Sequence, residues 1–80
     1  MALPKAYEEV IDFIAAGSNP SSVVAFRPSE ATRARVADLL VRGKTGSLIP
    51  EETSELEHYL QLEHIMRLAK ARAKQHISRT

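Results

Sequence analysis

The segment Pro50–Gln75 constrains the fold of this chain more than any other part. Its apolar residues recur at i, i+3, i+4 and i+7, the spacing of one face of an α-helix. Acids precede bases along it: Glu51, Glu52, Glu55, Glu57 and Glu63, then Arg67, Lys70, Arg72 and Lys74. Because a helix is partially positive at its N-terminus and partially negative at its C-terminus, this order favours one continuous helix. We expect it over residues 50–76, with a length of about 39 Å for the 26 residues of this segment.

Composition limits how large a core the chain can build. Its 80 residues correspond to one small domain. Eleven residues are alanine, only four are aromatic and none is tryptophan. Many alanines and few bulky side chains favour helices that pack closely. A partner or a second copy would supply further buried area.

Charge and cysteine content argue against several functional classes. The absence of cysteine excludes disulfides and thiolate metal sites. A net charge of +1 argues against a bulk electrostatic nucleic-acid binder, although residues 66–80 hold five bases and no acid. With no long apolar run, we expect no membrane partner and a cytoplasmic location.

The first helix is predicted over residues 4–16. Pro4 suits the first helical position, and Gly17 suits the position just after the helix end. The predicted inward stripe comprises Tyr7, Val10, Ile11 and Ile14.

Residues 21–26 are ambiguous. The β-branched pair Val23 and Val24 permits a short strand, whereas Asn19 and Pro20 form a good N-cap and N1 pair for a helical turn. The helical turn is favoured. A strand at Ser22–Arg27 would instead match the ribbon-helix-helix plan of dimeric DNA-binding proteins.

The second main helix is predicted over residues 29–42, with a loop at 43–47. Arg35, Asp38 and Arg42 have the spacing of i,i+3 and i,i+4 ion pairs. The predicted inward residues are Thr32, Val36, Leu39 and Leu40.

The last helix is longer than the first two can cover, so we expect part of it to project. Its predicted main stripe comprises Tyr59, Leu62, Met66, Ala69 and Ala73, flanked by Leu56, Leu60 and Ile65. The predicted fold is therefore all-α: a small bundle of three main helices, an extra helical turn, and a long, partly projecting C-terminal helix.

No pattern of catalytic or ligand-binding residues is evident. His58 and His64 are six residues apart, not the i,i+4 pair of a zinc helix. Gly43-Lys44-Thr45 lacks the upstream glycine of a phosphate-binding loop. The glutamates at the start of the last helix are interpreted as solvated charges that stabilise the helix dipole. We predict no enzyme activity, no cofactor and no metal.

Two stretches, Phe26–Leu40 and Pro50–Ala73, carry a resemblance to a known group. They resemble small bacterial proteins with a Pro-Glu-Glu helix start, a Glu-Leu-x-x-Tyr segment and a terminal Leu-Ala-Lys-x-Arg-Ala. Such proteins are regarded as antitoxin-like, and their genes frequently lie beside a nuclease gene. The resemblance implies a non-enzymatic protein that binds and neutralises a nuclease.

On this interpretation the last helix binds the partner. Its apolar residues would lie in a groove of the nuclease and its bases would meet acidic groups. The candidate residues are Leu62, Met66, Arg67, Ala69, Lys70, Arg72, Ala73 and Lys74. Two alternatives remain open: a homodimeric DNA-binding regulator of ribbon-helix-helix type, and a self-assembling module whose last helix pairs with its own copy.

Overall fold

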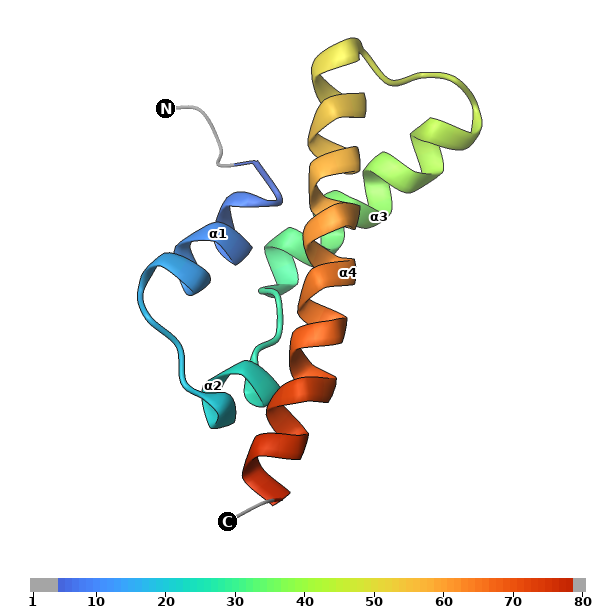
Figure 1. The fold of residues 1–80 in the computed structure, drawn as a ribbon. Helices are drawn as coiled ribbons and strands as arrows, with labels where there is room; N and C mark the ends of the chain where they lie inside the picture. The colour runs from blue at the N-terminus through green and yellow to red at the C-terminus, as the bar shows by residue number, and fades with distance from the viewer. Residues whose placement is uncertain (1–4, 79–80) are drawn as a thin grey trace.

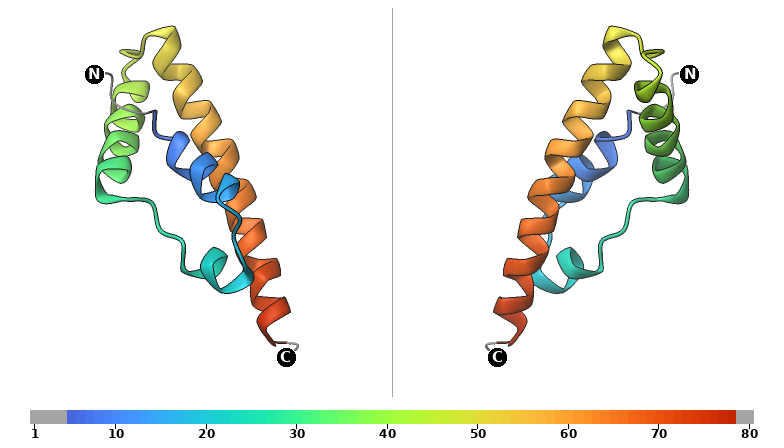
Figure 2. Two further views of the ribbon diagram at one scale, coloured as in Figure 1. Left: turned by 90° about the vertical axis from the view of Figure 1, so that its left-hand side faces the viewer. Right: turned by 90° about the vertical axis from the view of Figure 1, so that its right-hand side faces the viewer.

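The computed structural model describes residues 5–78, and within them the chain is all-α, as predicted. The helices are α1 (Glu8–Ala15), α2 (Pro20–Ala25), α3 (Glu30–Lys44) and α4 (Pro50–Ser78). α4 forms the long axis of the molecule, and the other three helices lie on one side of it (Figures 1 and 2). Its 29 residues span about 43 Å, close to the longest extent of the chain, 48 Å.

α1 starts later than predicted and ends at Ala15, one residue before the predicted end. Its first residue is Glu8, whose backbone N–H donates to the carbonyl of Lys5 at 3.0 Å. Pro4, the expected first helical residue, lies outside the described residues. Gly17 follows the helix with φ +82°, a conformation that glycine adopts without steric cost.

The face that α1 buries differs from the predicted one. Val10 is buried, but Ile11 and Ile14 are 44% and 46% exposed. The inward face runs instead through Val10 and the half-buried Phe13. The ring centroid of Phe13 lies 4.4 Å from that of Phe26. Pairing two large aromatic rings buries much apolar area, which accounts for the rotation of α1.

Residues 20–25 form the short helix α2, so the strand considered at Ser22–Arg27 is wrong. Ser22 N donates to Asn19 Oδ1 at 2.9 Å, and Asn19 N donates to Ser22 Oγ at 3.0 Å. This reciprocal capping box satisfies two backbone donors at the helix start. Pro20 at the first helical position needs no partner for its nitrogen. The ribbon-helix-helix alternative therefore lacks its strand.

α3 begins at Glu30 and is capped by Ser29, the residue at which the sequence predicts this helix to start. Its Oγ accepts the backbone N–H three residues further on at 3.2 Å, and its own N–H donates to Glu9 Oε1 at 2.7 Å. The second bond ties the start of α3 to α1. Val36 and Leu39 are buried as expected, but Leu40 is 43% exposed. Leu40 lies about 100° around the helix from Leu39, so it cannot share the same inward direction.

The start of α4 has no side-chain cap from the residue before it. The carboxylate of Glu52 reaches back to that residue's backbone N–H instead. α3 continues to Lys44, and the turn uses Gly46 at φ +72°. Ile49 precedes α4 and has no side chain able to cap it. Glu52 Oε1 instead accepts from Ile49 N at 3.2 Å, which is half of a capping box.

Arginines of α3 bind the first glutamates of α4. Glu55 is only 5% exposed and accepts from Arg35 Nη2 and from Ala6 N, each at 3.0 Å. Glu52 accepts from Arg42 Nη1 at 3.0 Å. The interpretation of these glutamates as solvated helix-end charges is wrong for Glu55, because the fold brings Arg35 and a backbone N–H against it. These bonds join α3 and α4 to the chain just before α1.

The same bonds shift the pKa values of both carboxyls. Hydrogen bonds from Arg42, followed by the one from Ile49 N, lower the pKa of Glu52 to about 2. For Glu55, the hydrogen bonds from Arg35 lower the pKa and outweigh the opposing effect of burial. The predicted i,i+4 ion pair is also confirmed, with Arg42 Nη2 lying 3.0 Å from Asp38 Oδ2.

α2 covers the alanine face near the C-terminal end of α4 (Figure 1). Ala73 is 6% exposed, and Lys70 Nζ donates to the carbonyl of Phe26 at 2.6 Å. Small side chains let α2 approach closely, so α4 is partnered as far as Ala73. Its last residues, 74–78, are exposed.

Candidate functional site

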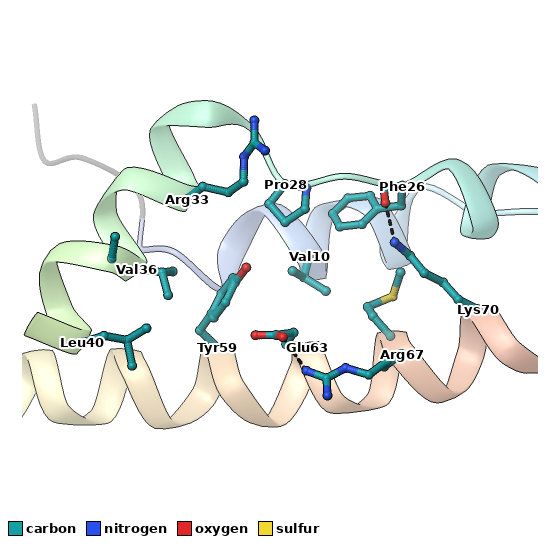
Figure 3. Close-up of a pocket in the computed structure, with 12 residues that line it drawn as sticks. Val10, Phe26, Pro28, Arg33, Val36, Leu40, Tyr59, Glu63, Arg67 and Lys70 are labelled. Atoms are coloured by element: carbon teal, nitrogen blue, oxygen red, sulfur yellow. Dashed lines mark hydrogen bonds and ion pairs between the residues drawn. The ribbon is translucent and has the colours of Figure 1, made fainter.

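A groove of about 400 Å³ lies between α3 and α4 (Figure 3). Its floor consists of buried apolar side chains from three helices: Val10 of α1, Val36 of α3, and Tyr59 and Met66 of α4. None of the four is more than 9% exposed. The floor of the groove is therefore also the core of the protein.

The walls of the groove are apolar and partly accessible. Leu40 and Ala37 contribute from α3, and Phe26 and Pro28 contribute from the segment between α2 and α3. Leu40 is the most informative of these, because its exposure of 43% leaves a large apolar side chain open beside the groove. Such a surface favours an apolar ligand or an apolar face of another protein.

Tyr59 places a polar group within this apolar site. Its ring stands in the groove, and its hydroxyl points into the space between the walls (Figure 3). Burial, assisted by the nearby negative charges of Glu63 and Glu9, raises the pKa of Tyr59 above its ordinary value of 10.0. The hydroxyl is therefore neutral at physiological pH and can donate or accept a hydrogen bond.

The edge of the groove carries three cations and one acid. Arg33 belongs to α3, whereas Glu63, Arg67 and Lys70 belong to α4. Arg67 pairs with Glu63 at 2.6 Å, yet its side chain remains 72% exposed. Because Glu63 balances only one of the cations, the groove edge has a net positive charge. It suits a ligand that is apolar in the centre and acidic at its margin.

Lys70 has a structural role as well as a place at this edge. Its Nζ donates to the Phe26 carbonyl at 2.6 Å and lies 6.0 Å from the Phe26 ring centroid. Burial, with the nearby charges of Arg27 and Lys74, lowers the pKa of Lys70 below its ordinary value. This contact holds the segment after α2 against α4 and so helps to shape one end of the groove.

The structure divides the eight predicted partner-binding residues among three environments. Met66, Arg67 and Lys70 line the groove, and Lys74 lies seven residues from Arg67 on the same side of α4. Three face the interior or the other helices: Leu62 packs on the core, Ala73 is buried and Ala69 is half-buried. Arg72 is exposed and lies on a different side of α4.

Sequence reasoning missed the part of the groove that α3 contributes. Arg33, Ala37 and Leu40 follow one another at i, i+4 and i+7 and share a face of α3. That spacing was readable in the sequence, but Leu40 was assigned to the inward stripe with Val36 and Leu39. A second stripe, offset from the buried one, was the available signal.

A second hollow of about 440 Å³ lies between α1 and α3 and is lined by several acids. Two of these have structural roles: Glu9 accepts from Ser29 N, and Glu55 accepts from Arg35 and Ala6 N. Among residues 5–78, no three histidine, aspartate or glutamate side chains form a group that could hold a metal ion. We therefore assign this hollow a structural role, because its acids Glu9 and Glu55 make hydrogen bonds that hold the helices together.

One hydroxyl–imidazole pair occurs on the surface of α4. Ser54 Oγ lies 3.4 Å from His58 Nδ1, and the His58 ring packs edge-on against Tyr7 with centroids 5.2 Å apart. Both Ser54 and His58 are exposed, and the pair lies outside the two hollows. No carboxylate among residues 5–78 binds the imidazole, so the pair lacks the third group of a catalytic triad within the described range.

Comparison of the chain with protein-family models, curated proteins and solved structures found no match. None of the helices described over residues 5–78 combines the length and apolar character needed to cross a membrane.

Proposed function

We propose that this chain is a non-enzymatic, antitoxin-like protein that binds and neutralises a nuclease through α4 and the adjoining groove. The partner inserts an apolar helix or loop between α3 and α4. The observation that carries the proposal is the groove, with its buried apolar floor, accessible Leu40 and net positive edge. A groove that accepts the apolar face of an amphipathic segment is a recurrent mode of protein recognition.

The charges at the groove edge support an acidic partner. Arg33 has no ion pair with any residue in the described range, and Arg67 extends into solvent beyond Glu63. Complementary charges speed association and select among partners. A metal-dependent nuclease offers clustered carboxylates at its active site, and covering them would block its substrate.

This proposal revises which surface of α4 meets the partner. Ala73 and Leu62 pack within the chain, so they support the binding surface and do not form it. Deleting the helix after Ile65 would remove Met66 from the core and unfold the protein. Point variants at the groove are therefore the sharper test.

The test is co-expression with the product of the neighbouring gene, followed by pull-down and by assay of that product for nuclease activity at equimolar protein. Leu40→Glu places a charge in the groove and should abolish both capture and inhibition. Val41→Glu is the matched control, because Val41 is 64% exposed on the same helix and does not line the groove. Equal behaviour of the two variants would refute the assigned surface.

Charge reversal supplies a second, independent comparison. Arg33→Glu should slow association and weaken binding, most strongly at low salt. Lys44→Glu changes the net charge equally but lies at the far end of α3, outside the groove. A nuclease that remains fully active in the presence of folded wild-type protein would overturn the proposed function as a whole.

A further inference from the structure

The side of α4 that faces away from the other helices is uncovered along its length (Figure 2). We define the outer face of α4 by Ile65 and Leu68 with their neighbours on the same side, Glu57, Gln61, His64 and Arg72. The two apolar side chains are 52% and 60% exposed. The groove residues of α4 lie on another side, so this face is a separate surface.

Two charged residues bracket the apolar centre of the outer face. Glu57 precedes it and Arg72 follows it, and both are exposed. They lie 15 residues apart, which corresponds to about 22 Å along the helix axis. Neither has an ion pair with a residue in the range 5–78, in contrast to Glu52, Glu55 and Glu63. Their charges are available to an external partner.

The order of these charges makes the outer face complementary to itself. We propose that α4 pairs with α4 of a second copy of this chain in antiparallel orientation. With the two-fold axis between His64 and Ile65, Glu57 of each copy lies opposite Arg72 of the other. Leu68 then lies opposite Gln61, close to the axis. A parallel pair would instead place like charges opposite one another at both ends, which is unfavourable.

Such a pair is an isologous two-fold dimer, the commonest assembly of soluble proteins. It buries Ile65 and Leu68, two of the large apolar side chains that the monomer leaves exposed on α4. It also supplies the additional buried area that a chain with eleven alanines and four aromatic residues lacks. The groove stays open in this dimer, so the inference does not depend on the proposed function.

Sedimentation equilibrium from micromolar to millimolar concentration tests the association. The mass should rise with concentration from 8.9 kDa towards twice that value. Leu68→Glu should keep the protein monomeric throughout, whereas Val41→Glu on α3 should dimerise as the wild type does. A wild-type mass of 8.9 kDa at every concentration, or a dimer that survives Leu68→Glu, would overturn the proposal.

Charge reversal tests the orientation. Glu57→Arg or Arg72→Glu alone should weaken dimerisation several-fold, because each change places like charges opposite one another in both halves of the pair. The double variant Glu57→Arg/Arg72→Glu should restore it. Single variants without effect would contradict the antiparallel arrangement.

Because the chain has no cysteine, introduced cysteines provide a direct measure of register. His64→Cys lies beside the two-fold axis and should form a disulfide-linked dimer under mild oxidation. Gln75→Cys, farther along the same face, lies far from its copy in an antiparallel pair and should not cross-link. Cross-linking through Gln75→Cys as fast as through His64→Cys would indicate a parallel pair and refute the proposal.

Discussion

The acidic and basic halves of α4 use their charges in different ways. In the acidic half, the side chains of Glu52 and Glu55 are 15% and 6% exposed and are bound by arginines of α3. In the basic half, the side chain of Arg67 is 72% exposed and pairs only within its own helix. Both halves complement the helix dipole equally well. A favourable position in the helix dipole is therefore shared by charges that hold the fold together and by charges that are available to a partner.

Packing follows the same division. The acidic half is attached to α3 by ion pairs and to the core by Tyr59. The basic half is attached to α2 by close approach over Ala73 and by the bond from Lys70 to the Phe26 carbonyl. We therefore expect substitutions of charge to destabilise the first half, and substitutions of size to destabilise the second.

The largest effect is expected from Glu55→Gln. The substitution removes a buried negative charge that accepts three hydrogen bonds, two from Arg35 and one from Ala6 N. The free energy of unfolding should fall by about 1.5–3 kcal/mol, measured by urea denaturation. Glu57→Gln on the exposed side of the same turn should change it by less than about 0.5 kcal/mol. A similar loss of unfolding free energy for both variants would contradict the distinction between a glutamate bound by Arg35 and an exposed one.

Ala73→Leu tests the packing of the basic half. The larger side chain has no room beneath α2, so the free energy of unfolding should fall by about 1–3 kcal/mol. Ala71→Leu adds the same volume at an exposed position of α4 and should cost less than about 0.5 kcal/mol. If Ala73→Leu were as well tolerated as Ala71→Leu, α2 would not be packed closely on α4.

Acid should weaken the acidic half selectively. Folding lowers the pKa of Glu52 from 4.5 to about 2, so its ionised form stabilises the folded state above pH 4.5. That contribution is lost as pH falls from 4.5 through about 2, and the melting temperature should fall with it. Glu52→Gln should melt lower at neutral pH and lose less on acidification. Parallel pH profiles for the two proteins would contradict the role of Glu52.

The smallest effect is expected from Lys74→Ala. Lys74 is exposed beyond the last buried residue of α4, and its side chain has no ion pair within residues 5–78. The free energy of unfolding should change by less than about 0.5 kcal/mol in a urea titration. A loss as large as that of Glu55→Gln would show that the basic charges also hold the fold together.

Several local features of the fold were predictable because they depend on neighbouring residues alone. Asn19, Pro20 and Ser29 mark helix starts, and Asp38 and Arg42 have the spacing of an ion pair within one helix. The groove was less accessible to prediction. Arg67 and Lys70 were identified from the charge of α4, but Arg33 and Leu40 were not, since only the crossing of α3 over α4 brings them together.

By itself, the sequence determined the three main helices, the order of charges along α4 and the shortage of bulky apolar residues. These follow from local spacing, capping and composition. The tertiary structure decided which face of each helix is buried, which glutamates are bound by arginines and which side of α4 is left uncovered. A helix with apolar residues on more than one side has no locally preferred inward face. The direction of burial is settled by contacts such as Phe13 with Phe26 and Arg35 with Glu55, between residues far apart in the chain.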